Sequence, residues 1–217
     1  PAAISGTAEG VQLLITAGVD VNARNKSGYT PLHWAAALGT AETVQLLITA
    51  GADVSARAMT GDTPLHQAAA LGTGETIEAL IAAGADISAR NEYGYTPLLW
   101  AAEEGTAEAT VALIAAGADI TAKAEDGRSV WEYAKKNDKL AGTEALWALA
   151  EALGKCSKWC DAGWWMQATA ADLQALLDAG AFTKLTKKDR ETAWNLAKTS
   201  PLQGSDAYWA LNDARFK

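Results

Sequence analysis

The protein has 217 residues, enough for one elongated domain or two compact ones. Its net charge of −8 argues against a nucleic-acid partner, because phosphate binding requires clustered Lys and Arg. No stretch reaches the roughly 18 consecutive apolar residues that a membrane-spanning helix needs, so membrane insertion is not expected. Two cysteines are too few to build a fold from disulfides.

An internal repeat of 33 residues organises most of the chain. The tripeptide Thr-Pro-Leu begins at positions 30, 63 and 96, and a degenerate copy begins at Ser129. A second marker, Ala-Gly followed by Val or Ala and then Asp, begins at positions 17, 50, 83 and 116. Self-similarity at one fixed spacing predicts a stack of small supersecondary units.

The opening unit, residues 1–21, contains only the second half of this pattern. Residues 6–20 predict one helix and its glycine stop, and the helix that would pair with it is missing. We therefore expect the natural chain to extend upstream of Pro1, and we expect an exposed apolar edge formed by Val11, Leu14 and Ile15.

The next unit, residues 22–54, shows how each first helix is specified. Thr30 is a good N-cap, because its side chain can accept a hydrogen bond at the helix start. Pro31 has a φ preset for the first helical position. The sequence "LHWAAAL" then predicts a short helix that ends at Gly39.

The second helix of that unit follows at once. Thr40 caps it, and Glu42 lies in the first turn, where the helix dipole favours a negative charge. Gly51 ends it, in a left-handed conformation that other residues tolerate poorly. Its apolar face consists of Val44, Leu47 and Ile48.

The segments "GYTPLHWAA", "GDTPLHQAA" and "GYTPLLWAA" resemble the ankyrin repeat family, whose pattern is G-x-T-P-L-H-x-A-A followed by G-A-D. The resemblance covers about residues 6–153 and implies an all-α solenoid of helix-turn-helix units. It also implies that the motif histidines, His33 and His66, bridge neighbouring backbone groups rather than hold a metal. Gly-Thr pairs at positions 39, 72 and 105 stand where the family usually has Gly-His.

Two closing units are expected. Residues 1–153 form a first module of the opening unit, repeats 22–54, 55–87 and 88–120, and a capping repeat 121–153. Residues 156–217 form a minimal second module, with an opening unit 156–183 and a closing unit 184–217. The charge changes at the same boundary, from −10 in residues 1–153 to +2 in residues 154–217. The two closing units align through the pairs Trp131/Trp194, Ala134/Ala197, Lys135/Lys198 and Trp147/Trp209.

The resemblance also implies where a partner binds, since ankyrin proteins generally use the turn tips and the concave face of the first helices. Aromatic residues and Arg are the usual energetic anchors of interfaces, and the glutamates predict a basic patch on the partner. The candidate partner-binding residues are Lys26, Tyr29, Met59, Asp62, Glu92, Tyr93, Tyr95, Glu103, Glu104 and Arg128.

Cys156 and Cys160 lie four residues apart and leave three readings open. They can form a local disulfide in an exported protein, remain reduced and partly buried, or act in redox chemistry. Two thiols make an incomplete zinc site. The C-x-x-x-C segment and the ending "SDAYWALNDARF" are similar to ankyrin proteins of bacteria, particularly proteobacteria, which often carry an export signal. The compartment is thus open between export and the cytoplasm.

The sequence therefore favours a non-enzymatic scaffold that binds another protein and needs no cofactor. No phosphate-binding loop or catalytic triad is present in the sequence. The alternatives are a self-assembling component that docks through its exposed terminal repeat, and a thiol redox factor.

Overall fold

The computed structural model describes residues 8–140, 143, 149 and 193–206. The chain divides into two compact units, residues 1–140 and residues 141–217. The first predicted module ends later, at residue 153. The predicted division into modules remains a prediction, because most residues around position 153 lie outside the described ranges.

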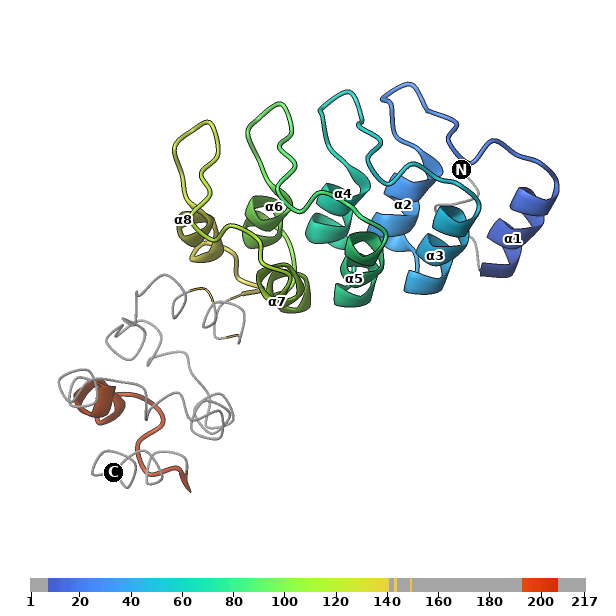
Figure 1. The fold of residues 1–217 in the computed structure, drawn as a ribbon. Helices are drawn as coiled ribbons and strands as arrows, with labels where there is room; N and C mark the ends of the chain where they lie inside the picture. The colour runs from blue at the N-terminus through green and yellow to red at the C-terminus, as the bar shows by residue number, and fades with distance from the viewer. Residues whose placement is uncertain (1–7, 141–142, 144–148, 150–192, 207–217) are drawn as a thin grey trace. The chain divides into compact units, whose positions relative to one another are not determined.

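The first unit is a stack of short helices with the predicted period. The helices that follow the Thr-Pro or Ser-Val signal are α2 (Pro31–Leu38), α4 (Pro64–Leu71), α6 (Pro97–Glu103) and α8 (Val130–Ala134). Those that follow the Gly-Thr pair, preceded by the helix of the opening unit, are α1 (Ala8–Thr16), α3 (Ala41–Thr49), α5 (Gly74–Ala82) and α7 (Ala107–Ala115). Figure 1 shows the two sets as two rows, which we call the first-helix row and the second-helix row. Within the described residues, β structure is limited to an isolated bridge between Lys123 and Ser129.

Packing follows the repeat. Each first helix packs on the next, α2 on α4, α4 on α6 and α6 on α8, and α2, α4 and α6 also pack on the second helices of their own units, α3, α5 and α7. The core between the helices is rich in fully buried leucines and alanines. Leu32, Leu65 and Leu98 occupy one repeat position and have no exposed surface. Small helical residues let neighbouring helices approach closely, so each unit is stabilised mainly by its neighbours.

Four hairpins connect the second helix of one unit to the first helix of the next, and they project to the same side of the stack (Figure 1). The tips of these hairpins are residues 25–29, 58–62, 91–95 and 124–128. Each tip closes with the same two backbone hydrogen bonds, such as Asn91 N–H to the Tyr95 carbonyl (3.0 Å) and Gly94 N–H to the Asn91 carbonyl (3.1 Å).

Adjacent tips are joined by one further backbone bond each. The donors and acceptors are Met59 N–H to the Ser27 carbonyl, Glu92 N–H to the Thr60 carbonyl, and Glu125 N–H to the Tyr93 carbonyl, at 2.9, 3.0 and 3.2 Å.

A series of arginines, which we call the arginine ladder, links the same hairpins through side-chain hydrogen bonds to backbone carbonyl groups. The guanidinium of Arg24 donates to the Arg57 carbonyl (2.6 Å), that of Arg57 donates to the Arg90 carbonyl, and that of Arg90 donates to the Lys123 carbonyl (2.9 Å). These residues are 33 apart, so each cation bonds to its counterpart in the next repeat. The tips therefore form a connected surface.

The opening edge differs in part from expectation. Leu14 is exposed and Ile15 is half-buried, but Val11 is 3% exposed, so the prediction that Val11 is exposed is wrong. Val11 is buried because α1 packs on α3. An apolar cavity of about 420 Å³ lies at this edge, lined by residues that include Leu14, Ile15 and Trp34.

The second unit is described only in part. Residues 193–197 are helical, and Trp194 and Ala197 are buried. The ammonium of Lys198 lies 5.4 Å from the centre of the Trp194 ring. In the first unit, the ammonium of Lys135 lies 6.0 Å from the Trp131 ring. The two segments aligned from sequence thus share one local contact, while the second module itself stays a prediction. Trp147 and Trp209 lie outside the described residues.

Candidate functional site

A row of contacts between repeats runs across the stack where the hairpins meet the first helices. In each, a residue at the end of a hairpin tip is hydrogen-bonded to a first-helix residue 38 positions later, in the next unit. These pairs are Tyr29 with Gln67 (3.5 Å), Asp62 with Trp100 (3.4 Å) and Tyr95 with Tyr133 (2.6 Å). The tips and the first-helix row therefore form one surface, which we call the hairpin surface.

Asp62 belongs to this row but lies inside it, with 4% of its surface exposed. Its carboxyl group accepts hydrogen bonds from the Asn91 amide (2.7 Å) and the Thr60 hydroxyl (2.7 Å), in addition to the Trp100 indole. The prediction that Asp62 faces a partner is thus wrong. The longer side chains of Tyr29, Tyr95 and Arg128 at the same repeat position are half-buried or exposed, whereas the short Asp62 side chain turns inward to donors that include Asn91 and Trp100 of the next repeat.

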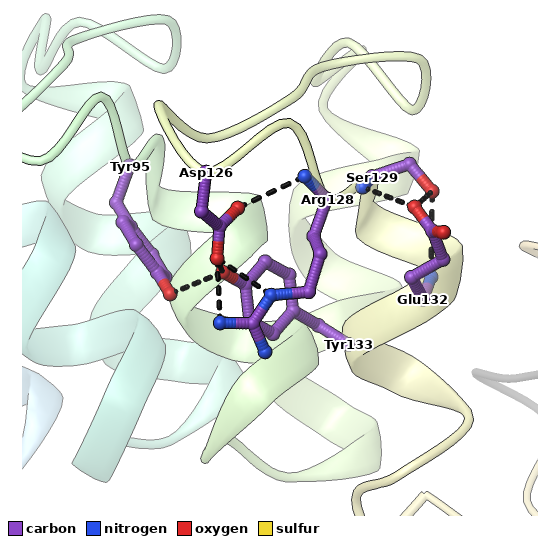
Figure 2. Close-up of polar contacts among 6 residues, drawn as sticks. All are labelled: Tyr95, Asp126, Arg128, Ser129, Glu132 and Tyr133. Atoms are coloured by element: carbon purple, nitrogen blue, oxygen red, sulfur yellow. Dashed lines mark hydrogen bonds and ion pairs between the residues drawn. The ribbon is translucent and has the colours of Figure 1, made fainter.

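The next part of the row is a chain of hydrogen bonds that ends on a carboxylate (Figure 2). The Tyr95 hydroxyl donates to the Tyr133 hydroxyl, which donates to Asp126 Oδ2 at 2.7 Å. Arg128 Nε also donates to Asp126 Oδ2, at 2.5 Å, and its guanidinium lies 4.6 Å from the centre of the Tyr133 ring. Asp126 is therefore held by the Tyr133 hydroxyl, by the Arg128 guanidinium and by the backbone N–H of Arg128, which donates to Oδ1.

The protonation states follow from these contacts. The hydrogen bond from Tyr133 and the backbone N–H of Arg128 lower the pKa of Asp126, so its carboxyl group is charged at neutral pH. Burial raises the pKa of both Tyr95 and Tyr133, so both phenols stay protonated and able to donate.

The two motif histidines, His33 and His66, are buried, and each is held by hydrogen bonds at both ring nitrogens. Nδ1 of His33 accepts from the Thr30 N–H (3.1 Å), and Nε2 lies 3.0 Å from the Asp62 carbonyl. His66 makes the same pair of bonds to Thr63 and the Tyr95 carbonyl. A neutral imidazole protonated on Nε2 satisfies every bond, so the bridging role that the family resemblance implies is present in both repeats.

The histidines predict a pH dependence of stability. Burial lowers the pKa of His33 and of His66 below the ordinary 6.5. The unfolded chain then binds more protons than the folded chain just below pH 6.5, so the free energy of unfolding decreases as the pH falls through that value. We expect the melting temperature to fall between pH about 7.5 and about 5.5.

The matched variant replaces both histidines with leucine, the residue that the chain itself uses at the equivalent, fully buried Leu99. Its melting temperature is expected to be lower at neutral pH but nearly constant over that pH range, because no imidazole remains to titrate. Melting temperatures are measured by circular dichroism at each pH. If they decrease in parallel for the two proteins, the histidines are not the cause of the pH dependence.

A pocket of about 390 Å³ opens on the hairpin surface between the third and fourth tips. Its lining comes from both tips and from α6, and consists of Tyr93, Tyr95, Trp100, Glu103, Glu125 and Asp126. The rings of Tyr95 and Trp100 pack together with centroids 5.2 Å apart and a tilt of 42°. The pocket thus combines aromatic rings with carboxylates.

Comparison with protein families agrees with this architecture. The model of the family "Ankyrin repeats (3 copies)" matches residues 2–91 and residues 55–124, together more than half of the chain. The protein belongs to the ankyrin repeat family. No curated protein matches the chain. Ankyrin repeats are generally protein–protein interaction modules and typically carry no enzymatic activity.

Most of the predicted partner-binding residues lie on the hairpin surface and have accessible side chains. Met59 and Tyr93 are the most prominent, with 68% and 56% of their surfaces exposed. Tyr29, Tyr95 and Glu103 are half-buried. The remaining exposed candidates are Lys26, Glu92, Glu104 and Arg128. Cys156 and Cys160 lie outside the described residues.

Two residues of the pocket between the third and fourth tips were not predicted from the sequence. Trp100 and Glu125 both line the pocket but are not among the candidate partner-binding residues from the sequence. The available signal was the recurrence of a Tyr and a Trp five residues apart, as in Tyr29 with Trp34 and Tyr95 with Trp100. That spacing brings the two rings together in both repeats, at 5.8 and 5.2 Å.

Other kinds of site are not found in the described part of the chain. It contains no group of three or more His, Cys, Asp or Glu residues arranged to hold a metal ion. None of its helices is long and apolar enough to cross a bilayer.

Proposed function

We propose that the protein is a non-enzymatic scaffold that binds another protein through the hairpin surface. The observation that carries this proposal is the pair of large exposed side chains at consecutive tips, Met59 and Tyr93, of which Tyr93 also lines the pocket. Exposed apolar and aromatic residues on a rigid support are typical anchors of interfaces. The backbone hydrogen bonds between adjacent tips and the arginine ladder hold the tips in place. Binding therefore loses little conformational entropy through ordering of the tips.

Charge defines the kind of partner. The third tip and the end of α6 carry Glu92, Glu103 and Glu104, and the net charge of the whole chain is −8. A partner with a basic patch is favoured here, and its association is expected to weaken with added salt. The same charge disfavours nucleic acid. The compartment, exported or cytoplasmic, stays a prediction.

Affinity capture tests the proposal. The immobilised intact chain is compared with the variant Tyr93→Ala/Glu92→Lys, and bound proteins are quantified by mass spectrometry. We expect the principal partner to bind at least about tenfold less to the variant, because an aromatic anchor is lost and one charge is reversed. Tyr95 is left intact, since its ring packs on Trp100 and its hydroxyl bonds to Tyr133.

The matched control makes the same chemical changes on the second-helix row. Leu13→Ala/Glu78→Lys removes one exposed apolar side chain from α1 and reverses one exposed charge on α5. Capture is expected to match the wild type. A partner lost equally from both variants, or from the control alone, would place binding elsewhere.

The apolar cavity beside α1 favours a second candidate, self-assembly through the opening edge. Its lining is mostly aliphatic, and exposed apolar surface of this kind favours association. Sedimentation over a range of protein concentrations tests it. The redox alternative depends on Cys156 and Cys160, outside the described residues, and no observation favours it.

A further inference from the structure

The pocket between the third and fourth tips has unused negative charge. Within the described residues, the one salt bridge joins Arg128 to Asp126. Glu103 and Glu125, which both line the pocket, therefore have no cationic side chain at ion-pair distance there. Asp126 is already paired with Arg128, and the side-chain interaction of Glu103 is with the neutral Tyr95 hydroxyl, so the charges of the two glutamates are available to a ligand.

The pocket also has an aromatic surface available for stacking. The Tyr93 side chain is mostly exposed, and among the described residues its ring has no ring partner and its hydroxyl makes no hydrogen bond. The faces of aromatic rings are electron-rich and attract cations. Carboxylates and ring faces in one cavity thus favour a cationic ligand over a neutral or anionic one.

The geometry favours a guanidinium group. Glu103 comes from α6 and Glu125 from the following tip, so a ligand between them needs donors that point in more than one direction. A guanidinium has five N–H donors in a plane and stacks on aromatic rings, whereas an ammonium is a compact point charge.

The protein itself shows this mode of binding directly beside the pocket. The Arg128 guanidinium donates to the Asp126 carboxylate at 2.5 Å and lies over the Tyr133 ring at 4.6 Å (Figure 2). A carboxylate from a tip and an aromatic ring from a first helix therefore already hold one arginine on this surface. The pocket offers the same kinds of group, with the carboxylates of Glu103 and Glu125 and the rings of Trp100 and Tyr93 in its lining.

We propose that this pocket binds the side chain of an arginine residue of the protein partner. That the arginine belongs to a protein partner rests on the proposed function. That the pocket recognises a guanidinium group rests on the pocket alone. Glu103 and Glu125 accept its N–H groups, and Tyr93 covers its flat face.

Nuclear magnetic resonance titration of the intact chain tests the proposal. The probes are arginine, lysine and citrulline, each blocked as the N-acetyl methylamide. Citrulline has the shape of arginine without the charge. The readout is the indole N–H signal of Trp100, assigned through the variant Trp100→Phe. We expect arginine to shift this signal saturably with a dissociation constant on the order of 1 mM, and we expect much weaker effects from lysine and citrulline.

Charge-neutralising variants locate the site. Glu103→Gln and Glu125→Gln are each expected to weaken arginine binding about threefold to fivefold, as for one exposed ion pair. Glu78→Gln on α5 is the control and should leave the constant unchanged. Circular dichroism verifies that each variant is folded.

Several results would overturn the proposal. Equal shifts from arginine and citrulline would exclude charge recognition, and equal shifts from arginine and lysine would exclude guanidinium recognition. An effect of Glu78→Gln as large as that of Glu103→Gln would exclude this pocket. If arginine fails to bind but capture still depends on Tyr93, this inference fails and the scaffold function stands. If arginine binds but no partner depends on the hairpin surface, the scaffold function fails.

Discussion

Substitution of Gly105 by alanine is expected to destabilise the folded chain by about 3 kcal/mol. A β-carbon at this position would overlap the Ala69 carbonyl oxygen of the neighbouring repeat. It would also lie 2.6 Å from Cα and 2.8 Å from the carbonyl oxygen of Ala101. Both obstacles are helix backbone: the Ala101 overlap requires the end of α6 itself to distort, and the Ala69 overlap requires α4 to move away from this unit. Gly105 is therefore required for the close approach of adjacent units.

Gly84→Ala is the matched control. Gly84 has φ of +88°, and no atom lies within 4 Å of a β-carbon added there. The substitution thus costs only the left-handed backbone strain, about 1 kcal/mol. Thermal and urea unfolding followed by circular dichroism compare the two variants. Equal losses of stability would show that Gly105 is not required for the close approach of adjacent units.

The second large effect is expected at Asn91, where Asn91→Ala should lower the free energy of unfolding by about 3 kcal/mol. The Asn91 side chain accepts hydrogen bonds from the N–H groups of Tyr93 (3.0 Å) and Tyr95 (2.9 Å). Its amide also donates to the buried Asp62 carboxyl at 2.7 Å. Truncation leaves Oδ1 of that carboxyl group with only the longer bond from the Trp100 indole (3.4 Å), and an under-satisfied buried carboxyl group is costly.

Asn25→Ala separates the two contributions. Asn25 occupies the equivalent position of the first tip and bonds to the N–H groups of Ser27 and Tyr29, both at 2.9 Å, but it is exposed and has no buried carboxyl to serve. We expect a loss of about 1 kcal/mol. Alanine itself is compatible with the tip, because Ala58 and Ala124 stand at this position in other repeats. If the two variants lose the same stability, the Asp62 bond has no net effect.

Much of the fold follows from local signals in the sequence. Thr30, Thr63 and Thr96 each stand directly before a helix that starts at proline, as capping and the fixed φ of proline predict. Gly51 has φ of +89°, as expected for a glycine that ends a helix. These features are determined within one repeat, so the sequence of one repeat suffices to predict them.

Features that arise between repeats were harder to predict. Gly72 directly follows the last residue of α4, as the repeat pattern predicts, but Gly72 and Gly105 also allow close contact with the backbone of the preceding unit, which the pattern does not predict. The burial of Asp62 depends on Asn91, 29 residues later. The pocket requires Tyr93, Trp100 and Glu125 from two adjacent units. Such contacts depend on how units stack, and the spacing of residues along the chain does not specify them.

Photo-crosslinking from the third tip tests the binding surface most directly. A benzophenone amino acid replaces Tyr93 in the intact chain, and a second version carries it in place of Glu78 on the second-helix row. We predict covalent adducts with a protein partner from position 93, reduced by excess blocked arginine, and few from position 78. Adducts from position 78 in equal or greater yield would contradict partner binding at the hairpin surface.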